Sequence, residues 1–198
     1  MAEFAALLHR PGPGNHTTTL TIDGGQVRTL VDLPPLRDHL LFVGVSPSTE
    51  SVEAGHYHQG RIGRTFWRRL MLATVLPAGT AVEDADDALV AAGHGITDLV
   101  KAVASDGDPT DDELRSGVGP LWQKVAIWRP AAVAFIDKRA AIACAGRPLA
   151  EPWGQLEGVA LAGRPCFLMP GAYASTDEVD EGLNFLRNLS AALPRDRA

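Results

Sequence analysis

Three short apolar runs constrain the fold more than any other feature of the chain. They read LLFV at residues 40–43, AAVAFI at 131–136 and PCFLM at 165–169. The first is too short for a helix and is bounded by Gly44 and Pro47, as expected for a buried strand. Segments with helical periodicity separate the runs. Strands that alternate with helices predict a parallel sheet covered by helices on both faces.

The N-terminal part of the chain carries the signals of a β-hairpin. Asp23-Gly24-Gly25 separates two segments rich in β-branched residues, 17–22 and 26–31. With 198 residues, 45% of them hydrophobic, the chain can build one full-sized core. We therefore expect one domain at residues 36–198, with an N-terminal arm and hairpin at residues 1–35 packed on it.

Helix caps and helix-breaking residues define the other elements. Thr110 and Glu113 match a capping box at the start of a helix. The segment around Asp98 fits either a strand or a loop, and residues 146–163 fit a loop that includes an edge strand. We expect helices at residues 65–76, 82–92, 110–128 and 138–145, and a last helix from a Thr176 cap through Leu189.

The carboxyl end of the first strand is the expected place for a ligand. Backbone N–H groups and loop side chains converge at the carboxyl ends of strands in an open α/β sheet. Residues 44–64 follow the strand and are small, polar, aromatic and glycine-rich until the helical pattern begins. We expect the active site on a loop formed by these residues.

Composition and charge exclude several classes of protein. No apolar run is long enough to span a membrane, and the N-terminus has an acid at Glu3 and lacks the pattern of a signal peptide. We therefore expect a cytoplasmic protein without a membrane partner. The net charge of -6 argues mildly against a protein that coats nucleic acid. A local basic cluster is nevertheless formed by Arg61, Arg64, Arg68 and Arg69.

Metal and phosphate-loop chemistry are not indicated by the residue spacing. Cys144 and Cys166 lack metal-ligand spacing and are predicted to be buried free thiols. His56, His58 and Glu53 lack a fourth ligand at a recognised spacing, so we predict no metal site. Neither GxGxxG nor GxxxxGK occurs, which argues against a nucleotide-binding enzyme with a glycine-rich phosphate loop.

Four segments resemble one family in order and in spacing. They read GVSPS followed by EAGHYHQGRIGRTFW, then GITDLVK, RPAAVAFIDKRA and LMPGAYAS. Through them the chain resembles the uracil-DNA glycosylase superfamily over about residues 30–189. It is most similar to the mismatch-specific uracil/thymine branch, whose members read roughly GINPG, GHHFAHPANRFW, GLTxLV, RPxVVAFLGK and NPSG. It also resembles the related deoxyinosine glycosylases, which share the wording EAGxYYxHPRNxFW.

The resemblance implies a three-layer α/β/α fold with a short, mainly parallel central sheet, and a base-excision mechanism. Such an enzyme flips a nucleotide out of the duplex and encloses its base. It then breaks the bond to the sugar through an oxocarbenium-like transition state, and the base leaves as an anion. The site needs an aromatic face, an acceptor that orients water or stabilises the sugar cation, donors for the anion and a wedge. No metal or cofactor is implied.

The resemblance implies catalytic positions at Asp98 and Ser46. Ser46 stands where most mismatch-type enzymes carry a water-orienting Asn, and a serine hydroxyl is a weak base. Asp98 matches a position close to the family's active site, where a carboxylate could polarise water and stabilise charge on the sugar. Alternatively, Asp98 only caps a turn. Gly63 and Arg64 fall where relatives have the Asn of the N-x-F-W segment, so two amides of the family pattern are missing.

Base-binding positions follow from the same resemblance. Gly44 and Val45 belong to the first motif, and His58 aligns with the pocket aromatic residue of the mismatch branch. Tyr57 is its neighbour, and one of the two should face the base. His56 and His58 could also donate hydrogen bonds to the leaving base. The alternative is that both histidines are solvated in an exposed glycine-rich loop.

The last motif takes the place of the family's wedge loop, which inserts into the duplex. Tyr173 could intercalate, while Gly171 and Ala172 would let the backbone approach the phosphates closely. Ser175 fits a helix N-cap, and the helix N-terminus there could hold a phosphate. Further candidates for contacts with the DNA backbone are Arg61, Arg64 and Lys101.

We therefore expect a monomeric DNA glycosylase that removes uracil or another deaminated base from double-stranded DNA, with single-stranded DNA as a further candidate substrate. Two alternatives stay open. One is a catalytically silent or altered-specificity superfamily member that binds DNA or a damaged base, which the missing amides suggest. The other is an unrelated nucleotide-binding α/β enzyme.

Overall fold

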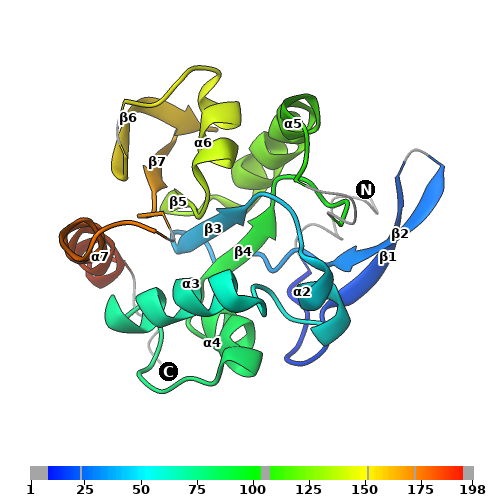
Figure 1. Cartoon of the computed structure of the whole chain (residues 1–198), viewed down its shortest axis with the longest axis horizontal. Coiled ribbons are helices and arrows are strands. Elements are labelled where there is room, and N and C mark those ends of the chain that lie inside the picture. The colour runs from blue at the N-terminus through cyan, green and yellow to red at the C-terminus, as the bar shows by residue number, and fades with distance from the viewer. Residues whose placement is uncertain (1–8, 23, 104–107, 151, 172, 194–198) are drawn as a thin grey trace.

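A five-stranded sheet forms the centre of the computed structural model, which describes residues 9–22, 24–103, 108–150, 152–171 and 173–193 (Figure 1). The strand order is β4-β3-β5-β7-β6. β3 pairs in parallel with β4 and β5, β5 pairs in parallel with β7, and β6 runs antiparallel to β7 at the edge. The bounds are β3 Leu40–Gly44, β4 Gly95–Asp98, β5 Ala132–Phe135, β6 Gly154–Leu161 and β7 Arg164–Leu168.

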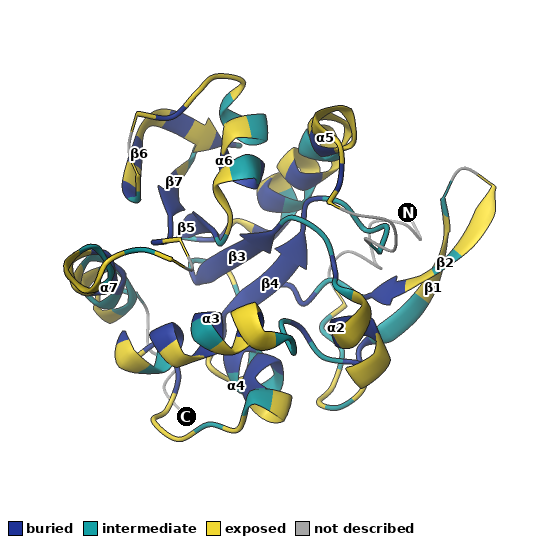
Figure 2. Cartoon of the chain, in the orientation of Figure 1, coloured by how far each residue is buried: buried dark blue, intermediate teal, exposed yellow. Residues whose placement is uncertain are grey.

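Helices cover both faces of this sheet because alternate strand residues point to opposite sides. On β3, Phe42 belongs to the core beneath α3, α4 and α7, whereas Leu41 and Val43 belong to the core beneath α5 and α6. The strands β3, β4 and β5 are buried along their length, as Figure 2 shows. The predicted α/β fold with a mainly parallel sheet is confirmed. The bounds are α3 Arg61–Leu72, α4 Ala85–Ala91, α5 Asp111–Trp128, α6 Lys138–Ala145 and α7 Thr176–Ala191.

The prediction of one continuous loop at residues 44–64 is wrong. A short helix, α2 (Thr49–Ala54), lies inside it, and α3 begins at Arg61 instead of residue 65. The Ser48 side chain caps α2 by accepting a hydrogen bond from the Ser51 amide, and Gly55 ends α2 in the left-handed conformation. The loop is therefore shorter than predicted, and its longest part is the stretch between α2 and α3.

The other helix boundaries lie close to those predicted. Thr110 forms a full capping box with Glu113 at the start of α5. The last helix is capped by Ser175, one residue before the predicted Thr176 cap, and Glu178 completes its capping box. The predicted helix at residues 82–92 divides into a 3-10 turn, η1 (Val82–Asp84), followed by α4.

The predicted hairpin is present as a separate two-stranded sheet that extends away from the central sheet (Figure 1). It consists of β1 (Thr17–Ile22) and β2 (Gly25–Leu30), paired antiparallel. Just beyond β2, Leu33 forms an antiparallel bridge with Ile96 of β4, which joins the hairpin to the main sheet. In the described part of the chain, no helix has the length and apolar character needed to cross a membrane.

Candidate active site at the carboxyl edge of the sheet

Two adjoining cavities open at the carboxyl edge of the parallel strands. The larger, of about 980 Å³, is lined by Gly44 at the end of β3, Ile136 after β5 and Met169 after β7. The smaller, of about 350 Å³, reaches Asp98 at the end of β4. Ser46 and His58 line both cavities. These volumes are in the range of small-molecule sites, and the position is the usual one for ligands in an open α/β sheet.

Asp98 is a buried carboxylate with an incomplete set of partners. It ends β4 opposite Gly44 and is 2% exposed. A side chain at position 44 would collide with Asp98 Oδ1, so only glycine leaves room for this carboxylate. Its Oδ2 has no hydrogen-bond partner among the described residues. Burial raises the pKa of Asp98 to about 6, against the opposing charge of Lys101.

His58 is the aromatic residue that both cavities share. Its ring centroid lies 4.8 Å from that of Phe66 and 6.1 Å from that of Trp67, two consecutive core residues of α3. Burial lowers the pKa of His58 to about 4, so the ring is neutral near pH 7. Its Nε2 is buried and has no hydrogen-bond partner among the described residues. A neutral imidazole can donate from one ring nitrogen and accept at the other.

Gly63 explains one of the two departures from the family pattern. His58 has a left-handed backbone with φ of 53°, which is uncommon outside glycine. A Cβ at position 63 would collide with the carbonyl of His58, so the start of α3 packs directly on the His58 backbone. An Asn at position 63 is therefore incompatible with this loop conformation.

Tyr57 lines the smaller cavity, and its hydroxyl is bonded to Lys101, which does not line it. Tyr57 is 1% exposed, and its hydroxyl donates to the Val31 carbonyl at 2.8 Å and accepts from Lys101 Nζ at 3.0 Å. Lys101 Nζ also pairs with Asp32 at 2.7 Å, and Asp32 binds Lys124 at 2.8 Å. The side chain of Lys101 is only 14% exposed. The predicted contact of Lys101 with the DNA backbone is therefore corrected, because its ammonium group is bound inside the protein.

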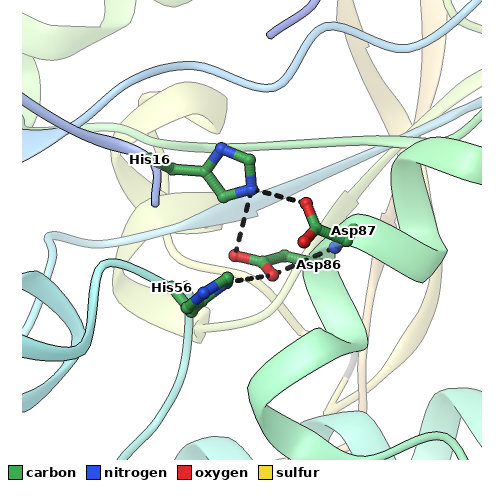
Figure 3. A group of neighbouring side chains, drawn as sticks. All are labelled: His16, His56, Asp86 and Asp87. Carbon is green, nitrogen blue, oxygen red and sulfur yellow. Dashed lines mark hydrogen bonds and ion pairs between the residues drawn. The ribbon is translucent and has the colours of Figure 1, made fainter. Parts of the chain in front are cut away.

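His56 points away from the two cavities. Its Nδ1 lies 2.9 Å from Asp86 Oδ1, and its ring meets that of His16 at 5.5 Å between centroids (Figure 3). It lines neither cavity. Although His56 and His58 are two residues apart, the turn between them sends their rings to different places. His56 is therefore not placed to contact a base in either cavity, whereas Tyr57 and His58 both line the smaller cavity.

Arg69 holds the segment that corresponds to the wedge loop. Its guanidinium donates from Nη1 to the Pro170 carbonyl at 2.6 Å and from Nη2 to the Gly171 carbonyl at 3.0 Å. Tyr173, two residues further on, is 85% exposed and lines the larger cavity. Ala172, the third predicted residue of this loop, lies outside the described residues. Sequence reasoning named Arg69 only as part of the basic cluster and gave it no role at the site, although it stands one helical turn from Thr65 on the face of α3 that meets the cavity.

The remaining side chains predicted to contact DNA, Arg61, Arg64 and Ser175, are exposed. Arg61 is exposed and lines the smaller cavity, whereas Arg64 is exposed and lines neither. The Ser175 hydroxyl is occupied by the capping box with Glu178 and lines neither cavity. Gly44 and Val45 line the larger cavity, and their carbonyls accept from the amides of Leu99 and Val100.

Cationic and aromatic residues that the motifs did not single out also line the larger cavity. Lys138 and Arg139 begin α6 directly after β5, and Trp153 precedes β6. Their position shortly after a buried strand could have predicted that both cations line the site, because the parallel strands all end at this edge of the sheet. Arg139 is partly committed to ion pairs with Asp108 and Asp111.

The motif order, the fold and this site identify the chain as a member of the uracil DNA glycosylase superfamily. The sequence model of that superfamily matches residues 31–187, which include every described residue of both cavities except Leu30. No curated protein matches the chain in a sequence comparison. Membership supports a glycosylase-type or related function on DNA and excludes the alternative of an unrelated nucleotide-binding enzyme.

Proposed function

We propose that this protein is a monofunctional DNA glycosylase that flips uracil or another deaminated base out of DNA and hydrolyses its N-glycosidic bond. The observation that carries the proposal is the pair of incompletely bonded, buried polar side chains on one cavity, Asp98 and His58. Buried polar groups are normally satisfied, so groups left free beside a cavity indicate a ligand that completes them.

The proposed reaction uses the two side chains on opposite sides of the bond that breaks. The bond between the base nitrogen and C1′ breaks with its electron pair going to the base. The carboxylate of Asp98 stabilises the developing positive charge on the sugar and orients a water whose oxygen bonds to C1′, taking up the proton that this water loses. The neutral imidazole of His58 stacks on the base or donates a hydrogen bond to the departing anion.

Other residues support binding of the DNA in this proposal. Tyr57 shapes the pocket, and the Ser46 hydroxyl assists in holding the water. Tyr173 enters the space left by the flipped nucleotide, while Gly171 lets the backbone approach the phosphates. Arg61, Arg64 and Ser175 contact the backbone of double-stranded DNA, or of a single strand if one is accepted. The protein acts as a monomer.

A second candidate function is a superfamily member that binds DNA or a damaged base without cutting uracil DNA. Ser46 favours it, because this hydroxyl replaces the water-orienting amide of the mismatch branch. Gly63 favours it less, since the collision with His58 described above gives a packing reason for glycine there.

The test is a single-turnover cleavage assay on labelled duplexes carrying G·U, A·U, G·T or hypoxanthine·T, followed by alkali. We expect cleavage of a uracil duplex that falls by about a hundredfold or more in Asp98→Asn, the size expected for a lost acid/base or charge-stabilising group. Glu157→Gln, which removes an exposed carboxylate on β6, is the matched control and should cleave like the native protein.

Two outcomes contradict the proposal in different ways. A native protein that shifts the duplexes in a gel but cuts none of them supports the silent or altered-specificity member. Equal cleavage by the native protein and Asp98→Asn leaves the glycosylase activity in place and removes Asp98 from its mechanism.

A further inference from the structure

Four potential metal ligands from separate segments meet outside the two cavities (Figure 3). His16 precedes β1, His56 follows α2, and Asp86 and Asp87 lie in the first turn of α4. One ligand atom from each lies within 4.8 Å of the other three. His16 Nε2 is 2.8 Å from Asp87 Oδ1 and 4.0 Å from Asp86 Oδ2, while His56 Nδ1 is 2.9 Å from Asp86 Oδ1.

Two residues of this cluster, His16 and Asp86, are buried, and the other two are partly exposed. The side chain of Asp86 is 0% exposed and that of His16 is 1% exposed. Two carboxylates with two neutral imidazoles carry a charge of −2, and buried charge is costly unless it is paired or binds a metal. A divalent cation would cancel the charge of the cluster.

We propose that His16 Nε2, His56 Nδ1 and one carboxylate oxygen from each of Asp86 and Asp87 bind a Zn²⁺ ion. Histidine nitrogen and carboxylate oxygen are both zinc ligands, and four protein ligands are typical of a closed, structural site. Tetrahedral ligands about 2.0–2.2 Å from zinc lie roughly 3.3–3.5 Å apart. The recorded N–O separations run from 2.8 to 4.0 Å, and one ligand atom from each residue lies within 4.8 Å of the others, so the side chains must close slightly around the ion. The two imidazoles favour zinc over calcium or magnesium, which prefer oxygen ligands.

The ion would fasten the N-terminal segment to the loop that carries the base pocket. Asp86 Oδ2 accepts from the Tyr57 amide at 2.8 Å, and Asp87 Oδ2 accepts from the Gly14 amide at 2.9 Å. The His16 amide donates to the Gly55 carbonyl at 2.8 Å. A metal at this point therefore supports the segment that positions Tyr57 and His58, and its role is structural. The prediction of no metal site considered His56 only with His58 and Glu53, and the fold gives it other neighbours.

Zinc titration of the untagged, chelator-treated full-length protein tests the site directly. We expect one Zn²⁺ per chain by calorimetry, and a melting temperature that rises by about 5–10 °C at a free Zn²⁺ concentration a hundred times the Kd. His16→Gln and Asp86→Asn should each weaken binding at least about tenfold. His9→Gln, which removes an exposed histidine, is the matched control and should bind like the native protein.

A further readout locates the ion without relying on variants. Amide hydrogen exchange at Tyr57, whose N–H donates to Asp86, should slow when Zn²⁺ is added. If Asp86→Asn does not fold, His56→Gln replaces it, because the His56 side chain is partly exposed. The proposal is overturned if the native protein does not bind Zn²⁺, or if His16→Gln and His56→Gln bind it as tightly as the native protein. None of these outcomes depends on glycosylase activity, so the two proposals can fail separately.

Discussion

Replacing Asp98 with Asn should lower activity and raise stability at the same time. The buried carboxylate has its pKa raised from 3.8 to about 6, so the folded state disfavours its ionised form. The free energy of unfolding of the native protein therefore falls once the pH rises above the pKa that Asp98 has in the unfolded state. It continues to fall until the pH passes the pKa of Asp98 in the folded state. Asn has no charge and escapes this loss. In the proposed mechanism, a group that the reaction needs is thus kept at a cost to folding.

The size of the stability effect follows from the pKa shift. Linkage predicts that the free energy of unfolding of the native protein falls, relative to Asp98→Asn, by about 2 kcal/mol between pH 4 and pH 8. Any constant cost of placing the Asn amide in this site cancels in that difference. Urea unfolding of both proteins across the pH range measures it, with Glu157→Gln as a control whose difference from the native protein should stay flat.

The same shift predicts the pH dependence of catalysis. If the carboxylate is the active form, the single-turnover rate should rise about tenfold per pH unit below pH 6 and level off above it. The residual rate of Asp98→Asn should not show this rise with pH. A stability difference that does not change with pH, or that changes in the opposite direction, would refute the burial argument. A rate profile without the rise would refute the role of the carboxylate.

Two further substitutions test the contacts that shape the site. Arg69→Lys keeps the charge but loses the planar fork whose two nitrogens reach the Pro170 and Gly171 carbonyls separately. We therefore expect a loss of about 1–2 kcal/mol in urea unfolding and weaker duplex binding in a gel-shift titration. Unchanged values in both would contradict the role of Arg69. Gly63→Ala introduces a Cβ that collides with the His58 backbone and should destabilise the protein by at least about 2 kcal/mol. Gly119→Ala, where an added Cβ meets nothing within 4 Å, should instead be neutral or stabilising by about 0.5–1 kcal/mol. Equal melting temperatures for the two alanine variants would show that the close approach at residue 63 can relax.

The strands and most helices could be predicted because their signals are local. A run such as LLFV between turn residues, or Thr110 three residues before Glu113, specifies an element whatever the rest of the chain does. The short helix α2 was missed because its six residues show little periodicity, although Ser48 and Gly55 mark its two ends. The beginning of α3 was placed late for a similar reason, since its first turn is polar and glycine-containing.

Roles of single polar side chains could not be predicted, because they depend on neighbours that are distant in sequence. Lys101 looks like a surface cation until the fold sets Asp32 beside it. His56 and His58 stand in one short motif, yet His58 lines the cavities whereas His56 contacts Asp86.

The sequence by itself determined the architecture and the edge of the sheet where a site belongs, since hydrophobic periodicity and chain order are sufficient for both. It also determined the superfamily, through motifs that stand in order along the chain. Only the tertiary structure decided which polar groups remain free beside a cavity and which are used up inside the protein. The reason is that burial, pKa and hydrogen-bond satisfaction are properties of an environment assembled from segments that lie far apart in the chain.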